Sequence, residues 1–317
     1  MEWLRTMWLP VSQGSDFAKE IDGLFMDIFW LSMFFFVGIV AAMIYFAWRY
    51  RFKPGRVTPH QTHNTTLEVV WTVIPTLIIL VLFFVGVISY MKFAVAPGEA
   101  MEIQITGKQW LWTFEYPDGT RSVNEMHVPV NKNVRLVMTS EDVLHDFYVP
   151  DMRIKRDLIP GRYTQIWFRS NNSAIGEHVA TCAEYCGKGH SDMHAKLLVD
   201  SQADFDKWMA TGGTEWEDYK GHMWDWGKIQ WDRKGCSTCH TLDGTSSKGP
   251  TWKGIWGTMV TLSDGKTVLV DEAYVRESMM LPQAKIVKGF DPVMPTFQGL
   301  LRENEIQGLV ALIKSLQ

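Results

Sequence analysis

Residues 28–48, IFWLSMFFFVGIVAAMIYFAW, contain no Asp, Glu, Lys or Arg, and neither do residues 69–91, VVWTVIPTLIILVLFFVGVISYM. At about 1.5 Å of rise per residue, helices of these lengths reach roughly 31 and 34 Å, close to the roughly 30 Å of a bilayer core. The alternative, two buried helices of a large soluble core, fits neither their length nor their flanking charges. The sequence therefore predicts a hairpin of two transmembrane helices.

Basic residues dominate the segment between the two runs. No acidic residue precedes Glu68 there, whereas the basic residues are Arg49, Arg51, Lys53 and Arg56. By the positive-inside rule this short loop lies in the cytoplasm, so both termini and everything after the second run lie on the outer side. We expect an N-terminal segment at 1–22 and a hairpin at 23–95. Within the hairpin, the spans are expected at about 26–48 and 68–91, with a cytoplasmic loop at 49–67.

A pattern with a period of two residues follows the hairpin. Short β-branched or aromatic stretches, separated by Gly, Pro, Asn and Asp, occur at residues 102–106, 110–116, 134–140, 163–168 and 194–199. This spacing is typical of a small antiparallel sandwich or barrel, which we place at residues 96–200.

The remainder of the chain changes character twice. Residues 201–225 are rich in Asp and Glu around two glycines, so we expect a surface helix followed by a linker. Residues 226–317 are expected to be mostly helical, with helices at 274–280 and in the final stretch, where apolar residues recur three or four apart. The net charge of −4 is spread without a basic block, which gives nucleic-acid binding no electrostatic support.

The densest group of candidate metal ligands lies near the end of the β-rich region. It is His145 together with Cys182-Ala-Glu-Tyr-Cys186-Gly-Lys-Gly-His190-Ser-Asp-Met193. Two thiolates four residues apart can bridge two copper ions, to which His145 and His190 supply one imidazole each. Met193 offers a weak axial thioether, and the backbone carbonyl of Glu184 could serve the other ion. Zinc is the competing metal, but it has no use for the methionine and rarely uses this cysteine spacing.

A second group of candidate ligands begins with Cys236-Ser-Thr-Cys239-His240, the attachment sequence of a c-type heme. Two thiols add to the heme vinyl groups while His240 binds the iron; a redox cysteine pair or half a zinc site would not require that histidine. The opposite axial ligand must come from downstream. We predict Met294, because Pro292 and Pro295 hold its loop in an extended path, and a methionine ligand raises the potential of the iron.

Residues 20–200 resemble subunit II of the heme–copper cytochrome c oxidases, in which a two-helix hairpin precedes an all-β, cupredoxin-like Greek-key domain with a binuclear copper centre, CuA. The resemblance rests on Asp142-Val-Leu-His145, on Gln109-Trp-Leu-Trp112 and on the cysteine motif. It implies that the CuA ligands are His145, Cys182, Glu184 through its main chain, Cys186, His190 and Met193. Quinol-oxidising relatives lack the two cysteines, so the resemblance also implies a cytochrome as electron donor.

The same resemblance implies three further roles. Trp110 matches the family's tryptophan at the patch where electrons enter, with an ordinary strand aromatic as the alternative. Glu68 matches the carboxylate at the mouth of a proton-uptake channel, with a solvated helix cap as the alternative. The side chain of Glu184 is expected to help bind a magnesium ion at the subunit interface. His127 and His178 lie in no motif and are expected to be ordinary surface or packed residues.

Residues 226–317 resemble an all-α class I cytochrome c, through the heme motif, Gly249-Pro250 and a closing C-terminal helix. The resemblance implies that the carbonyl of Pro250 orients the proximal His240. A cytochrome c fused behind a CuA domain is the architecture of the caa-type oxidases. The chain as a whole is therefore expected to be a multi-domain protein with two redox domains outside the membrane.

Together these resemblances imply an enzyme subunit in a bacterial cell membrane that relays electrons from an external donor through heme c and CuA to subunit I, where dioxygen is reduced and protons are translocated. Expected partners are subunits I and III, the lipid bilayer, and either a soluble cytochrome c or a docked quinol-oxidising complex (cytochrome bc or alternative complex III). Two alternatives remain open. One is the electron-accepting subunit of a CuA-type nitric oxide reductase, and the other is a membrane-anchored copper carrier, which would not need a covalent heme.

Overall fold

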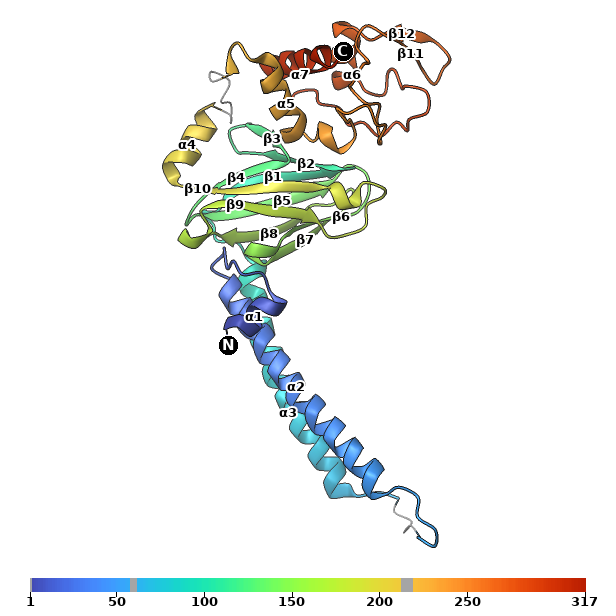
Figure 1. Cartoon of the computed structure of the whole chain (residues 1–317). Helices are drawn as coiled ribbons and strands as arrows, with labels where there is room; N and C mark the ends of the chain where they lie inside the picture. The colour runs from blue at the N-terminus through green and yellow to red at the C-terminus, as the bar shows by residue number, and fades with distance from the viewer. Residues whose placement is uncertain (1, 58–61, 212–218) are drawn as a thin grey trace.

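The structure is a computed structural model of the chain that describes residues 2–57, 62–211 and 219–317. Three parts follow one another along the sequence, and Figure 1 shows them stacked in that order: a helical hairpin, a β-sandwich and a C-terminal domain. The hairpin projects from one end of the sandwich, and the C-terminal domain lies over the opposite end. The sandwich thus separates the apolar helices from the C-terminal domain.

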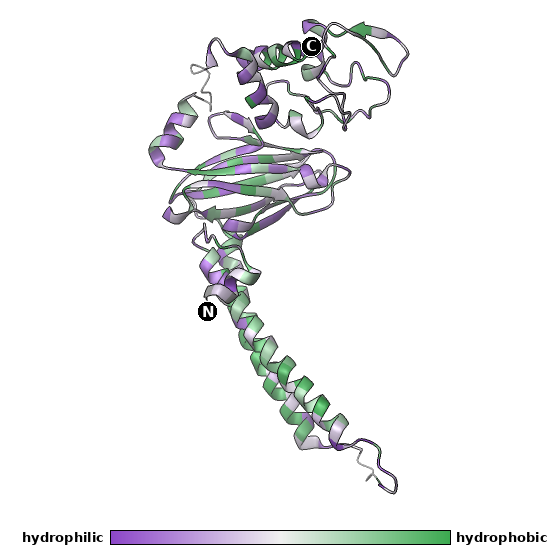
Figure 2. Ribbon diagram, in the orientation of Figure 1, coloured by the Kyte–Doolittle hydropathy of each residue, from purple (hydrophilic) through white to green (hydrophobic). Residues whose placement is uncertain are grey.

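The hairpin consists of α2 (Ala18–Arg49) and α3 (Thr65–Ala94), preceded by the short helix α1 (Glu2–Trp8). Both long helices are long and apolar enough to cross a membrane, and Figure 2 shows that hydrophobic residues run along most of the hairpin. Two apolar helices are therefore confirmed. Both helices extend beyond the uncharged runs. On the side of the sandwich, α2 begins at Ala18, before its run, and α3 continues to Ala94, after its run. Part of the expected cytoplasmic loop, residues 58–61, lies outside the described residues.

A buried charge cluster fixes the sandwich to the top of the hairpin. Asp22 in α2 is 1% exposed and accepts hydrogen bonds from the Arg153 guanidinium at 2.8 and 2.9 Å. Arg5 from α1 adds a third at 3.1 Å. A buried carboxylate is stable only when it is paired in this way, so the three residues determine where the sandwich sits on the helices.

The β-sandwich contains two sheets, each of five strands among the described residues. One has the order β3-β2-β1-β5-β8 and the other β4-β10-β9-β6-β7. The first comprises β1 (Met101–Lys108), β2 (Leu111–Glu115), β3 (Arg121–Val123), β5 (Asn133–Ser140) and β8 (Thr164–Arg169). The second comprises β4 (Glu125–Pro129), β6 (His145–Val149), β7 (Ile154–Leu158), β9 (Gly176–Cys182) and β10 (His194–Asp200).

The cupredoxin-like sandwich is confirmed, but its sheets are mixed rather than antiparallel. β1 pairs in parallel with β5, and β10 pairs in parallel with β4. Parallel neighbours require a long connection, and here the chain passes through three other strands between β1 and β5. Fully buried aromatic side chains such as Trp112, Phe114 and Phe147 fill the space between the sheets.

The C-terminal region begins with α4 (Gln202–Thr211), the surface helix expected after the sandwich. The rest of the expected linker includes residues 212–218, which lie outside the description. Three α-helices are found in the described residues 219–317: α5 (Met223–Arg233), α6 (Glu272–Met280) and α7 (Glu303–Ser315). Leu309, Leu312 and Ile313 of α7 are buried in the core of this domain.

An all-α domain is not evident here, contrary to the expectation from the sequence. The helices are short, and long stretches between them, such as residues 282–302, follow irregular paths through several Pro and Gly residues. The domain also contains a β-hairpin of β11 (Met259–Thr261) and β12 (Thr267–Leu269) around the turn at Asp264 and Gly265. β-Branched residues on both sides of a Gly-containing turn favour strands over a helix.

Candidate metal centres

The candidate copper ligands meet at one end of the sandwich because two neighbouring strands end there. His145 is the first residue of β6 and Cys182 is the last residue of β9, and these strands pair antiparallel. The loop after β9 then brings Cys186, the short helix η3 (His190–Asp192) and Met193 back to the same place before β10 begins. We call residues 182–193 the copper loop.

The potential ligand atoms lie within a few ångströms of one another. The two Sγ atoms of Cys182 and Cys186 are 3.7 Å apart. Nδ1 of His145 lies 3.9 Å from the Sγ of Cys182, and Nδ1 of His190 lies 3.6 Å from the Sγ of Cys186. The remaining two ligand atoms are the Met193 Sδ, 3.8 Å from the Cys186 Sγ, and the Glu184 carbonyl oxygen, 3.1 Å from the Cys182 Sγ.

These distances fit metal ligation by thiolates and imidazoles. With metal–sulfur and metal–nitrogen bonds of about 2.3 and 2.0 Å, ligand atoms on one tetrahedral ion lie roughly 3.5 Å apart or slightly more. The observed separations between sulfur and nitrogen fall close to that value. The two sulfurs are too far apart for a disulfide bond, whose length is about 2.05 Å. Both cysteines are buried free thiols, so this set has the composition for one or two soft metal ions.

Protonation of the site favours a ligating thiolate. Burial would raise the pKa of the Cys182 thiol, but the adjacent His145 imidazole and backbone N–H groups lower it to about 7. Burial and the neighbouring Cys182 charge raise the pKa of Cys186. A metal that takes both thiolates therefore has to displace the second proton, which soft ions do readily because metal affinity and thiol deprotonation are coupled.

Asp142 orients one of the imidazoles, a role that the sequence motif did not reveal. Its Oδ1 lies 2.8 Å from the Nε2 of His145, so the imidazole can donate its Nε2 proton there and keep its Nδ1 lone pair directed at the cysteines. The other carboxylate oxygen accepts the backbone N–H of Gln109 at 2.8 Å. Asp142 thus ties the copper-ligand strand to the segment that carries Trp110.

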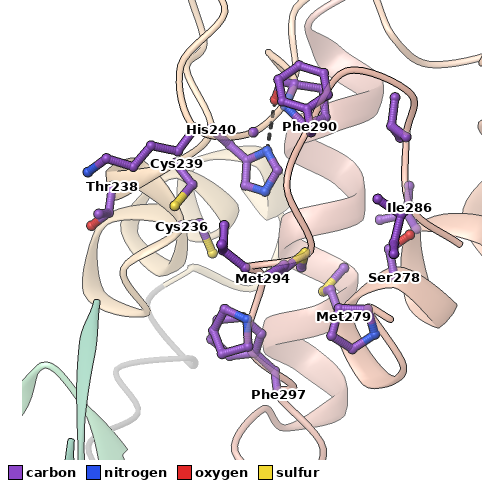
Figure 3. Close-up of a pocket in the computed structure, with 18 of the residues that line it drawn as sticks. Cys236, Thr238, Cys239, His240, Ser278, Met279, Ile286, Phe290, Met294 and Phe297 are labelled. Carbon is purple, nitrogen blue, oxygen red and sulfur yellow. Dashed lines mark hydrogen bonds between the residues drawn. The ribbon is translucent and has the colours of Figure 1, made fainter. Parts of the chain in front are cut away.

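The candidate heme residues surround one cavity in the C-terminal domain (Figure 3). Cys236 and Cys239 lie on one side, His240 points inward, and the side chains of Met279 and Met294 lie below it. The rest of the lining is mainly apolar and includes Trp252, Ile255, Val270, Val275, Ile286, Phe290, Phe297 and Leu309. All five named ligand candidates therefore face the same apolar space.

The environment of His240 suits an iron ligand. Its Nδ1 lies 2.8 Å from the Pro250 carbonyl, which accepts the Nδ1 proton and leaves the Nε2 lone pair available. Burial lowers the pKa of His240, so the imidazole is neutral, as a metal ligand must be. Trp252 stacks against the ring with centroids 5.3 Å apart, and Trp231 donates a hydrogen bond to the His240 carbonyl. The sequence predicted no role for either tryptophan.

Trp110 connects the two candidate sites. Its indole Nε1–H donates to the Cys186 carbonyl at 3.1 Å, and the Gln109 side chain donates to the same oxygen at 2.7 Å. Trp110 also lines the cavity of the C-terminal domain. It is only 8% exposed, because the C-terminal domain lies over it. An external protein therefore has little access to this side chain in the arrangement observed here.

Two candidate side chains remain, those of Glu68 and Glu184. Glu68 lies on the hairpin, and the Glu184 side chain faces solvent. Glu68, in the first turn of α3, accepts the backbone N–H of Asn64 at 3.1 Å, while Asn64 accepts the N–H of Leu67. This is a reciprocal helix cap at the loop end of the hairpin. The Glu184 side chain is exposed on the copper loop, where a partner protein could reach it.

Comparison with known proteins gives two family matches. Residues 5–91 match the transmembrane domain of cytochrome c oxidase subunit II, and residues 121–200 match its periplasmic domain. The alternative cytochrome c oxidase subunit 2 of Bradyrhizobium diazoefficiens is 30% identical over 64% of this chain and 82% of that protein. Cytochrome c oxidase subunit 2 of Alkalihalophilus pseudofirmus is 29% identical over 89% of this chain and 83% of that protein.

Among solved structures, the periplasmic domain of subunit II of cytochrome oxidase (CoxB) from Bradyrhizobium japonicum is 34% identical, with a TM-score of 0.35. It covers 37% of this chain and 96% of that one. The two matched domains occupy the hairpin and most of the sandwich, and the alternative subunit 2 from Bradyrhizobium diazoefficiens is matched over most of its own length. The chain therefore belongs to the cytochrome c oxidase subunit II family.

Proposed function

We propose that this member of the family is the electron-accepting subunit of a caa-type cytochrome c oxidase. It receives electrons at a covalent heme c in the C-terminal domain and relays them through a binuclear CuA centre to subunit I, which reduces dioxygen to water and translocates protons. The observation that carries the proposal is that Trp110 both lines the candidate heme cavity and is hydrogen-bonded to the main chain of Cys186. When bound, each of the two metal groups supplies a one-electron carrier.

In the copper site, the chain would hold two ions with a preformed set of ligands. Cys182 and Cys186 would bridge them, and His145, His190, Met193 and the Glu184 carbonyl would complete the set. The proposal is supported by the 3.7 Å separation of the two sulfurs and by the burial of His145 and Met193, both 0% exposed. Because the ligands are already in place, little of the protein has to move when the charge of the site changes. Zinc uses neither the methionine nor two bridging thiolates in this way.

In the C-terminal domain, the chain would attach heme through Cys236 and Cys239 and bind its iron through His240 and Met294. Pro250 fixes the tautomer of His240 by accepting its Nδ1 proton. The apolar lining of the cavity excludes water and, with a methionine ligand, favours a high reduction potential. The relative from Alkalihalophilus pseudofirmus supports a shared C-terminal region, since an alignment over 89% of this chain must reach well past the sandwich.

Trp110 would then act as an internal relay rather than as the contact for a soluble donor. Its 8% exposure and its place on the cavity wall support this reading. The external donor, a soluble cytochrome c or a docked quinol-oxidising complex, would instead meet the C-terminal domain. This changes the role that resemblance alone assigns to the tryptophan.

The remaining features fit the same assembly. We infer that the hairpin (23–95) spans a bacterial cell membrane beside subunits I and III, with the sandwich (96–200), the linker (201–225) and the cytochrome domain (226–317) on the periplasmic side. The exposed Glu184 carboxylate is free to meet a magnesium ion at the surface of subunit I. Glu68 would deliver protons from its position at the loop end of α3, in addition to capping the helix.

The test of the proposed function is metal analysis of the purified full-length chain. Two copper ions and one iron per polypeptide are expected, with the iron retained after denaturation because the heme is covalently attached. A single zinc, or iron that dissociates on denaturation, would contradict the proposal. The isolated chain should be redox active but unable to reduce dioxygen. The large subunit that co-purifies with it distinguishes an oxidase from a nitric oxide reductase.

A further inference from the structure

Lys248 is a nearly buried cation at the contact between the C-terminal domain and the sandwich. Its side chain is 11% exposed, and its Nζ lies 2.5 Å from the Oδ2 of Asp192. The same Nζ lies 5.1 Å from the centroid of the Trp110 ring. A lysine loses its hydration when it is buried to this extent, so its position depends on the carboxylate and the aromatic face that replace water.

The two partners of Lys248 belong to the candidate copper site. Asp192 lies in the copper loop between His190 and Met193 and closes the short helix η3. Trp110 is hydrogen-bonded to the Cys186 carbonyl in the same loop. One ammonium group of the C-terminal domain therefore contacts the copper loop at Asp192 and also the Trp110 ring, which is hydrogen-bonded to that loop.

On its own side, Lys248 directly precedes the residues that pack on His240. A Cβ atom on Gly249 would lie 2.7 Å from Cε1 of the His240 ring, so glycine is needed for the backbone to approach the imidazole this closely. Pro250 then accepts the Nδ1 proton of that imidazole. The segment 248–250 thus connects the cation at the domain contact to the candidate iron ligand within three residues.

The copper loop is shaped to receive this contact. A Cβ atom on Gly189 would lie 2.4 Å from Cδ2 of Trp110 and 2.7 Å from the Lys248 Nζ. Only glycine leaves space for the indole and the ammonium group at that point. The contact therefore depends on the backbone of the copper loop at Gly189 as well as on the lysine side chain.

We propose that Lys248 is a positioning residue that locks the segment 248–250 to the copper loop and so sets the rate of electron transfer between the two domains. The inference rests on the proposed function, because it takes the two sites as electron donor and acceptor. A pair between two exposed side chains would contribute little. Here Asp192 is 53% exposed, but the Lys248 side chain is only 11% exposed and also lies over the Trp110 ring. Loss of the ammonium group would release both loops and lengthen or disorder the path through Trp110.

The first experiment measures the contact itself, without any electron transfer. Hydrogen–deuterium exchange is followed in the full-length chain as purified for Lys248→Met, which keeps most of the aliphatic stem, and for Asp192→Asn. We expect faster exchange in both segments, 187–193 and 248–250, in each variant. The matched control is Lys266→Met, because the Lys266 side chain is 80% exposed in the β11–β12 turn and should change neither segment. Unchanged exchange in Lys248→Met would overturn the proposed lock.

The second experiment measures the rate of electron transfer from heme to copper after a light-induced reduction of the heme, in the metal-loaded full-length chain. Lys248→Met and Asp192→Asn should each slow it by roughly tenfold, and the double variant should be no slower than either alone, because partners in one contact are not additive. The exchanged pair Lys248→Glu with Asp192→Lys should recover part of the rate. If the rate reductions of the two single variants multiply in the double variant, the proposal is overturned.

Failure of this inference is distinguishable from failure of the proposed function. If the chain contains no heme iron or no copper pair, the proposed function is wrong. If both metals are present at full occupancy and Lys248→Met transfers electrons as fast as the unaltered chain, the relay stands and only the role of Lys248 is wrong. If Lys248→Met loses its metals, the exchange and electron-transfer measurements on Asp192→Asn decide in its place.

Discussion

The indole N–H of Trp110 donates a 3.1 Å hydrogen bond to the backbone carbonyl of Cys186, while Lys248 of the C-terminal domain lies 5.1 Å from the centroid of the same ring. Trp110 comes from the turn between β1 and β2, and Cys186 comes from the loop between β9 and β10. The bond therefore joins the two sheets of the sandwich at their shared end. Trp110 and the neighbouring Gln109 both line the cavity, and each reaches the main chain of a candidate copper ligand through one hydrogen bond.

Replacing Trp110 by Phe tests this connection. The variant keeps an aromatic ring but removes the N–H donor, so electron transfer between the two domains should slow by roughly tenfold, as small displacements of reacting groups commonly do. The electron paramagnetic resonance spectrum of the copper should be unchanged, since no ligand is altered. Trp224→Phe is the control, because that side chain is 49% exposed and does not line the cavity. Equal rates in Trp110→Phe and the unaltered chain would exclude the tryptophan as a relay.

Asp142→Ala should weaken copper binding without removing a ligand. The change leaves the Nε2 of His145 without its acceptor, and loss of such a partner commonly lowers metal affinity by about 10- to 100-fold. Competition with a copper chelator measures the effect. Asp264→Ala, in an exposed turn, should retain copper as the unaltered chain does. Identical retention in the two variants would show that the aspartate does not support the site.

Met294→Leu and Met279→Leu distinguish the two methionines that face the cavity. If Met294 binds the iron, its replacement lowers the reduction potential of the heme, whereas the covalent attachment through the cysteines persists. Turnover with the physiological donor should fall, while artificial reductants still reduce the copper. Redox titration of the heme provides the measurement. A large shift in Met279→Leu with none in Met294→Leu would reverse the assignment.

The pH dependence of stability should reflect His127. Burial lowers its pKa, but hydrogen bonds to Asp200 and Glu125 outweigh burial and raise the pKa above 6.5. A raised pKa in the folded state means that the imidazolium stabilises the fold fully below about pH 6.5 and loses this contribution as the pH rises through the folded-state value. Thermal unfolding at a series of pH values should show the decline, and His127→Gln should abolish it.

The acid side of the same profile follows Glu125. Burial raises its pKa, but the hydrogen bond with His127 and the charge of Arg233 lower it below 4.5. A lowered pKa contributes stability that is present above about pH 4.5 and is lost as the pH falls through the folded-state value. Because Arg233 belongs to α5, acid should loosen the C-terminal domain as well as the sandwich. A pH profile that is the same in Glu125→Gln would contradict this role.

Arg153→Met should destabilise the attachment of the sandwich to the hairpin. The substitution removes the Arg153 guanidinium from the buried Asp22 carboxylate, which is 1% exposed, and leaves it the hydrogen bond from Arg5. Removing one member of a buried ion pair costs about 3 kcal/mol of unfolding free energy, or somewhat less when another cation remains. Unfolding of the full-length chain in detergent measures it. Arg169→Met, whose exposed pair with Asp16 is 3.5 Å long, should change the unfolding free energy little.

Local patterns predicted the parts of this protein in which the periodicity is strong. The two uncharged runs became α2 and α3, and all five alternating stretches became strands. The three residues of β3 are too few for a pattern, and β7 does not alternate, since three exposed charged residues separate its two buried ends. The parallel pairing of β1 with β5 depends on contacts far apart in sequence. The β11–β12 hairpin escaped notice because the heme motif suggested helices on both sides of it.

For the candidate sites, spacing predicted the candidate ligands, which the structure brings close together, but not the residues that orient them. The cysteine and histidine motifs have specific chemistry, so His145 and the copper loop could be found from sequence alone. Asp142, Trp252 and Lys248 are ordinary residue types whose roles depend on which strands and loops meet. His127 was expected to be an ordinary residue, and only the fold brings Asp200 and Glu125 to its two ring nitrogens.

The placement of the C-terminal domain over Trp110 has a kinetic consequence. A soluble donor and its acceptor separate on dilution, but two domains of one polypeptide remain at a fixed effective concentration. In the proposed relay the step between them is first order, so neither donor concentration nor cell volume would change its rate. Only the encounter of the external donor with the C-terminal domain would be second order, and salt and diffusion would act on the flow of electrons at that step.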